Sequence, residues 1–211
     1  MPRQVDHVAR RAEIIAAAWT CMGETGIEGL TLRAVAASAQ CGLGRITHYF
    51  NDKEELIVAT LSAFVDETFA TLDAQEPKTI DELVEGLAEF HLPTSETTFR
   101  LGLVWLHFWA RAAYDEGLAE INRLWYAGLR GGLARMIGGL QELGQVPATV
   151  DASDAADQIA IVLDGIGIQA ALDRRLWAPS RQTAVLGTYI AQILHVESEQ
   201  RQPRLRMVRD E

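Results

Sequence analysis

Apolar residues recur at steps of three and four along most of the chain, which is the spacing of helices with one buried face. The first run predicts an amphipathic helix over residues 7–24 that stops before Gly26. Its apolar positions are Val8, Ala12, Ile15, Trp19 and Met22. Strand-like alternation is scarce, so the pattern predicts an all-α protein.

Two short apolar runs follow, Leu32–Ala39 and Leu43–Phe50, and a turn containing Gly42 separates them. Thr31 is a good N-cap for the first run, because its side-chain oxygen can accept a hydrogen bond from a free backbone N–H. Two short helices joined by such a turn are typical of a helix-turn-helix, whose second helix reads DNA. The helix over residues 7–24 would back the pair.

The remaining runs predict longer helices joined by short loops, several of them marked by proline. They cover about residues 52–75, 80–92, 95–112, 115–144, 152–175 and 180–196. We therefore divide the chain into a three-helix DNA-binding domain over residues 1–54, a helical effector-binding and dimerisation domain over residues 55–197, and a flexible tail over residues 198–211.

Charge is distributed unevenly over the 211 residues. The net charge is −10, yet residues 1–50 carry a net charge of +1, so the remainder carries −11. A near-neutral N-terminal region permits a local phosphate-binding face, whereas the acidic remainder is repelled from DNA.

The sequence offers no pattern typical of catalysis or metal binding. The five histidines include no pair at i, i+4, and Cys21 and Cys41 lack metal-ligand spacing, so we expect no metal, no cofactor and no enzymatic activity. The run Gly165–Ala170 fits a dinucleotide fingerprint, but no strand–helix–strand units flank it. Neither a signal peptide nor a membrane-length apolar stretch is visible, so we expect a cytoplasmic protein without a membrane partner.

The N-terminal motifs together resemble the TetR family of transcriptional regulators. The resembling segments are Thr31–Ala36, Gly44 with Ile46, His48–Phe50 and Asp52–Leu56. The resemblance implies a regulator that binds operator DNA through its helix-turn-helix, usually as a repressor. Val35, Ile46 and Phe50 would form the core that fixes the reading helix.

The resemblance also implies which residues contact DNA. Tyr49 and Lys53 match the family's phosphate contacts, a phenol donor and a point charge, and Thr31 can offer its hydroxyl. On the second helix, Arg45 could contact guanine and Thr47 a thymine methyl group. The predicted DNA-binding residues are Thr31, Arg33, Gly42, Leu43, Gly44, Arg45, Thr47, His48, Tyr49 and Lys53.

Three positions depart from the family pattern. Gln40 stands where the family usually has glycine, at a turn position that tends to need a positive φ. Gly42 stands where a capping serine is common; we expect it to take over the strained turn and to offer no side-chain cap, a loss of about 0.5–1 kcal/mol at most. Leu43 replaces an often polar residue. The fold should survive these changes, and operator affinity is the property they affect.

The C-terminal half resembles the repressors of choline-to-glycine-betaine genes over residues 80–195, through Trp105–Trp109, Leu163–Gly165 and Gln169–Leu172. Aromatic faces together with an acid could cage a cation, so we predict a pocket for a small apolar or cationic effector. Core packing is the competing interpretation for each aromatic residue. The predicted ligand-binding residues are Phe64, Trp105, Phe108, Trp109, Trp125 and Asp164.

Small residues line the apolar faces of the last two predicted helices, and in the resembled family these helices pair with their symmetry mates in a homodimer. A two-fold dimer would place two reading helices about one DNA turn apart, on a palindromic operator. Effector binding would tilt the helix over residues 52–75 and change that spacing by a population shift.

Two alternatives keep this fold. In the first, Cys41 in the turn acts as a redox switch in place of a ligand. In the second, the protein is a ligand-binding module with weak operator recognition, because Gln40, Gly42 and Leu43 depart from the family pattern.

Overall fold

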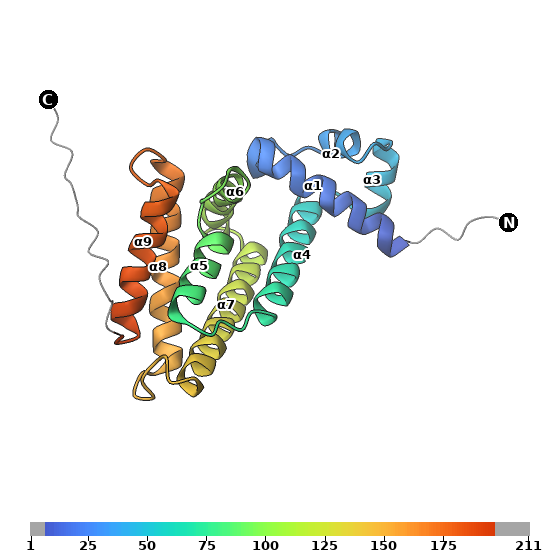
Figure 1. Ribbon diagram of the computed structural model, residues 1–211. Helices are drawn as coiled ribbons and strands as arrows, with labels where there is room; N and C mark the ends of the chain where they lie inside the picture. Colours follow the sequence, from blue (N-terminus) through green and yellow to red (C-terminus); the bar gives the residue numbers. More distant parts are fainter. Residues whose placement is uncertain (1–6, 197–211) are drawn as a thin grey trace, which may run out of the picture. The chain divides into compact units, whose positions relative to one another are not determined.

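The computed structural model describes residues 7–196, and these form helices, turns and loops without a strand (Figure 1). The first helices are α1 (His7–Gly29), α2 (Leu32–Ser38), α3 (Leu43–Tyr49) and α4 (Lys53–Asp73). Those that follow are α5 (Ile80–His91), α6 (Glu96–Ala112), α7 (Glu116–Glu142), α8 (Ala152–Leu172) and α9 (Pro179–Ile193). The all-α prediction is confirmed, and the tail predicted over residues 198–211 lies outside the described residues.

Helix starts follow local capping chemistry. The side chains of Thr31, Asp52 and Asp151 each accept a hydrogen bond from a backbone N–H in the first turn of α2, α4 and α8. Ser95 does the same for α6, through the N–H of Thr98. These bonds satisfy donors that have no partner inside the helix.

Gly26 breaks α1 without ending it. Its φ of 73° and ψ of 172° are not helical, and the helix resumes as far as Gly29. The predicted stop before Gly26 is therefore a kink. A Cβ at this position would lie 3.7 Å from the His107 ring, which is ordinary contact, so the positive φ and not crowding is what favours glycine.

The chain folds into two compact units, which we describe separately. The first unit contains Met1–Ala74 and Arg100–Leu129, and the second contains Gln75–Phe99 and Arg130–Glu211. Helix α4 therefore packs with the helix-turn-helix, and α6 and α7 contribute residues to both units. The functional boundary at residue 54 remains a prediction.

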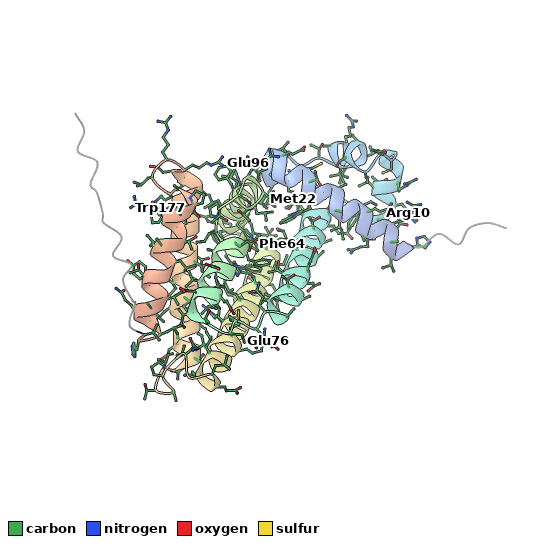
Figure 2. The ribbon with its side chains drawn as sticks, viewed as in Figure 1. Arg10, Met22, Phe64, Glu76, Glu96 and Trp177 are labelled. Carbon is green, nitrogen blue, oxygen red and sulfur yellow. The ribbon has the colours of Figure 1, made fainter. Side chains whose placement is uncertain are left out.

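The core of the first unit lies where α1, α2 and α3 meet α4. Met22, Val35, Ile46 and Leu56, one from each of these helices, are fully buried. Figure 2 labels Met22 on α1, which belongs to this core, and Phe64 on α4, which is half-buried and packs against it. The two short helices are too small to have a core of their own, so α1 and α4 supply it.

In the second unit, α8 packs against α9, and α9 packs against α5 (Figure 1). The buried Gln182 of α9 donates from Nε2 to the carbonyls of Pro93 and Trp177, at 3.1 and 2.8 Å. The dinucleotide-like run Gly165–Ala170 lies inside α8, so it forms no strand-to-helix turn.

Within residues 7–196, α8 alone is long and apolar enough to cross a membrane by length and composition. Of its most apolar stretch, 44% is buried inside the protein. Ile159, Leu163 and Ile166 are among its buried residues, as expected of a helix that packs in a protein core.

Candidate nucleic-acid interface and effector site

Helix α3 buries one face and exposes the other. Ile46 and the following Phe50 are almost completely buried, whereas Arg45, Thr47 and His48 are exposed. The prediction that Val35, Ile46 and Phe50 are core is confirmed. The exposed residues are those predicted to read base edges, and Leu43 and Gly44 lie on the surface with them.

The turn between α2 and α3 has its positive φ at Gln40, not at Gly42. Gln40 has a φ of 50°, while Gly42 has an extended backbone with φ −75° and ψ 149°. The N–H of Cys41 donates to the carbonyl of Ala36, and the N–H of Gln40 to that of Ala37. This is a Schellman motif, which needs a left-handed residue at Gln40. The expectation that Gly42 takes over the strained turn was therefore wrong, whereas its lack of a side-chain cap is confirmed.

Two predicted phosphate contacts already have partners in α1. The hydroxyl of Tyr49 lies 3.0 Å from Nδ1 of His7, and Nζ of Lys53 donates to the carbonyl oxygen of Glu28 at 2.9 Å. An ammonium group has three donors, so Lys53 keeps two for another acceptor. The contact with Glu28 holds the ammonium beside the end of α1.

Two α1 side chains, His7 and Arg11, contact residues at the end of α3, and no local sequence motif identifies them. The ring of His7 is 6.2 Å from that of His48, and the guanidinium of Arg11 lies 4.9 Å from the centre of the Phe50 ring. Both contacts join residues about forty positions apart, so sequence spacing could not reveal them. Arg11 adds a positive charge beside Phe50, the residue that ends α3.

Five of the six residues predicted to bind an effector form one aromatic cluster in the first unit. Trp105 is its centre, with ring centroids 4.7 Å from Trp125, 5.1 Å from Phe108, 5.8 Å from Phe64 and 6.1 Å from Trp109. These rings come from α4, α6 and α7, so the cluster joins α4, which follows the helix-turn-helix, to the parts of α6 and α7 that lie in the first unit.

Burial differs across this aromatic cluster. Phe108 and Trp125 are buried, whereas Phe64, Trp105 and Trp109 are half-buried. In the described part of the chain, the enclosed Nε1–H of Trp109 finds no acceptor. A buried donor without a partner costs about 1–3 kcal/mol, so a water or ligand oxygen would stabilise it.

Asp164, the sixth predicted ligand residue, lies on α8 in the second unit and takes no part in these ring contacts. Two aromatic residues of the first unit join the cluster without having been predicted. Trp19 of α1 stacks on Phe64 with centroids 4.4 Å apart, and Phe69 stacks on Trp125 at 5.8 Å. Trp19 was visible only as an apolar helix position.

An ion pair ties the start of α4 to the end of α6. The guanidinium of Arg111 binds the carboxylate of Glu54, in the first turn of α4. Helix α4 thus contacts α6 at two places, through the Glu54–Arg111 ion pair and through the Phe64–Trp105 ring contact. Among residues 7–196, no three His, Cys, Asp or Glu side chains gather as a metal site.

Helix α3 exposes a face that can read DNA, and its opposite face is fixed by the core. Helix α4 links this pair of short helices to an aromatic cluster. These features define a helix-turn-helix transcriptional regulator. A sequence profile for bacterial regulatory proteins of the tetR family matches residues 14–60, and one for the C-terminal domain of BetI-type transcriptional repressors matches residues 80–195. The chain belongs to the TetR family of transcriptional regulators, and it is not an enzyme.

Named relatives agree with this assignment. The regulator PksA of Bacillus subtilis is 28% identical over 176 residues, which cover 82% of this chain and 84% of PksA. BetI of Burkholderia mallei is 24% identical over 197 residues, covering 92% of this chain and 98% of BetI.

Solved structures share the fold. A transcriptional regulator from Rhodococcus sp. Rha1 superposes with a TM-score of 0.75 at 28% identity, over 88% of this chain and 96% of its own. A regulator from Saccharomonospora viridis, crystallised in complex with choline, has a TM-score of 0.73 at 22% identity, over 87% of this chain and 96% of its own.

Proposed function

We propose that this protein is a repressor that binds a palindromic operator as a homodimer and is released by a small effector. The observation that carries the proposal is the exposed face of α3. Arg45, Thr47 and His48 lie on this face, and the buried side chains of Ile46 and Phe50 anchor the helix from the other side. Arg45 can form two hydrogen bonds with guanine, and the Thr47 methyl group can contact thymine.

Phosphate contacts would fix the register of α3 on the duplex. Tyr49 and Lys53 flank the end of α3, and the exposed Arg33 lies on α2. Thr31 uses its oxygen as an acceptor for the cap, which leaves its O–H free to donate to a phosphate. Gly42 and Gly44 lie at the start of α3 without side chains, which permits close approach of the DNA backbone.

The homodimer would form through α8 and α9. Ile161 and Leu172 on α8 are 69% and 72% exposed, and Tyr189 on α9 is 48% exposed. Large apolar side chains gathered on neighbouring helices mark an interaction surface, and a two-fold axis would bury them against their own copies. The two α3 helices of the dimer would then read successive major grooves.

The aromatic cluster is the proposed effector site. Its half-buried rings favour an apolar or cationic body, and the unpaired Nε1–H of Trp109 favours an effector with a hydrogen-bond acceptor. The Saccharomonospora viridis regulator binds choline, which has both properties. The effector would act by favouring one orientation of α4, which carries Phe64 and is held by the Glu54–Arg111 ion pair.

A ligand trigger is preferred to a redox trigger. Cys41 is half-buried and packs against the core of the first unit. We place the regulator in the cytoplasm, where its DNA lies, without a membrane partner.

The test begins with selection of bound duplexes from a random pool. Fluorescence anisotropy then compares the selected duplex with a scrambled one over a range of salt concentrations. We expect a palindrome, affinity that falls steeply with salt, and twice the chain mass by light scattering at micromolar concentration. Failure to enrich any duplex would favour the alternative of a ligand-binding module with weak operator recognition.

A further inference from the structure

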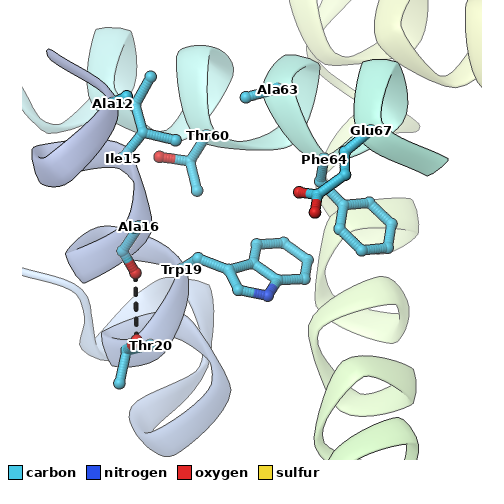
Figure 3. A pocket seen from close by; sticks show the side chains of 9 residues that line it. All are labelled: Ala12, Ile15, Ala16, Trp19, Thr20, Thr60, Ala63, Phe64 and Glu67. Atoms are coloured by element: carbon cyan, nitrogen blue, oxygen red, sulfur yellow. Dashed lines mark hydrogen bonds between the residues drawn. The ribbon is translucent and has the colours of Figure 1, made fainter. Parts of the chain in front are cut away.

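An open groove lies between α1 and α4 within the first unit (Figure 3). Its volume is about 460 Å³, which suits a small organic molecule. Residues at steps of three and four on each helix line it, so two helical stripes face each other. They are Ala12, Ile15, Ala16, Trp19 and Thr20 on α1, and Thr60, Ala63, Phe64 and Glu67 on α4.

The groove is open because small side chains meet where two helices would otherwise interdigitate. Ala12, Ala16 and Ala63 leave the space, and the stacked rings of Trp19 and Phe64 close one end of it. The rings are 4.4 Å apart and inclined by 16°, so they act as one aromatic wall. This wall is also the edge of the aromatic cluster, through Phe64.

The polar groups of the groove disfavour an anion. The hydroxyl of Thr60 donates to the carbonyl of Leu56 at 2.7 Å, and that of Thr20 donates to the carbonyl of Ala16 at 3.1 Å. Both hydroxyl protons are therefore used inside their own helices. Figure 3 shows the carboxylate of Glu67 beside the two rings. In the described part of the chain, this carboxylate makes no hydrogen bond or ion pair.

We propose that the groove between α1 and α4 binds a small organic cation. The charge would lie near the Glu67 carboxylate, and the apolar body would lie on the indole face of Trp19, above the three alanines. Aromatic faces and a nearby carboxylate both attract an ammonium group, and an alkylated ammonium gives up its water at low cost.

A cation in this groove would contact α1 and α4 at once. The helix-turn-helix is supported by these two helices, so the ligand would favour one angle between them and change operator affinity. This regulatory consequence rests on the proposed function. Binding of the cation does not, because it can be measured without DNA.

The probe is benzyltrimethylammonium, titrated by isothermal calorimetry into the full chain, with benzyl alcohol as the uncharged comparison. We expect saturable binding of the cation only. Glu67→Gln should weaken it about two- to fivefold, the effect of an exposed charge pair. Ala16→Leu, at an exposed position, should fill the groove and weaken it further.

Asp66→Asn is the matched control, because it removes the neighbouring exposed charge, which does not line the groove. Its affinity should equal that of the wild type. Equal affinity in wild type, Glu67→Gln and Ala16→Leu would overturn the proposal and place any cation site elsewhere. Absence of saturable binding would overturn it as well.

Operator binding separates this inference from the proposed function. Saturating cation should shift the affinity for the selected duplex at least threefold in wild type and less in Glu67→Gln. Normal operator binding without binding of the cation between α1 and α4 would overturn this inference and leave the proposed function unaffected. Binding of the cation between α1 and α4 by a chain that selects no duplex would support the cation site and overturn the proposed function.

Discussion

The phenol oxygen of Tyr49, in the last turn of α3, lies 3.0 Å from Nδ1 of His7, in the first turn of α1. The contact orients a side chain that we expect to donate to a DNA phosphate. Tyr49→Phe should therefore weaken binding to the selected duplex by roughly two- to tenfold, the value of one hydrogen bond, without changing the base preference. Anisotropy on matched and mismatched duplexes measures both effects.

His7→Ala tests whether the imidazole acts through Tyr49. If it does, the double variant His7→Ala/Tyr49→Phe should bind no more weakly than Tyr49→Phe alone. Fully additive losses of affinity would show that His7 has a separate role and that the 3.0 Å contact does not matter for DNA binding.

Lys53 has a structural partner in the Glu28 carbonyl and a predicted partner in DNA. Lys53→Met should reduce the magnitude of the slope of log affinity against log salt by about 1, because one phosphate contact is lost. Lys78→Met is the control, since Lys78 pairs with Glu76 outside the helix-turn-helix. An unchanged slope with a lowered melting temperature would assign Lys53 a purely structural role.

Gly44 lies in the first turn of α3, and a Cβ placed there would meet nothing within 4 Å. Glycine inside a helix destabilises it by roughly 0.5–1 kcal/mol relative to alanine, so the fold gives no reason for it. We expect Gly44→Ala to raise the free energy of unfolding by about that amount and to weaken operator binding, because the added methyl group would meet DNA. Urea unfolding measures the free energy of unfolding, and fluorescence anisotropy on the same preparation measures operator affinity. Undiminished operator binding would contradict a close approach of DNA to Gly44.

Gln40 occupies the left-handed position of a Schellman motif with a φ of 50°, and Gly144 occupies the matching position after α7 with a φ of 71°. The left-handed region costs a residue with a Cβ roughly 1 kcal/mol, and glycine avoids this cost. Gln40→Gly should therefore stabilise the protein by up to about 1 kcal/mol in urea unfolding, and Gly144→Gln should destabilise it similarly. A destabilised Gln40→Gly variant would show that the glutamine side chain contributes more than its backbone costs.

Local rules predicted the helices well, because capping and apolar spacing act within a few residues. Thr31 caps its helix as expected, and the aromatic residues at helical spacing do meet at Trp105. The contacts of His7 and Trp19 could not be predicted, since each depends on how α1 crosses a distant element. The error at Gly42 has a different cause: hydrogen bonds at the end of α2, and not residue type, decide which position has a positive φ.

Burial lowers the pKa of His91, at the end of α5, to about 4. The whole residue is half-buried, but its Nε2 is enclosed. The folded protein therefore keeps this imidazole neutral down to about pH 4, whereas the unfolded chain protonates it below its ordinary value near 6.5. Between these values the unfolded state binds more protons, so stability falls as the pH falls through this window and is unaffected by His91 above it.

The His91→Gln variant removes this proton uptake. We expect its free energy of unfolding to fall less between pH 7 and pH 5 than that of the wild type, by on the order of 1–2 kcal/mol. His195→Asn is the control, because His195 is exposed and asparagine tolerates its positive φ of 53°. Urea unfolding at the two pH values measures the difference. A pH dependence shared by wild type and His91→Gln would mean that other groups cause the acid sensitivity, and that the imidazole of His91 reaches solvent when it is protonated.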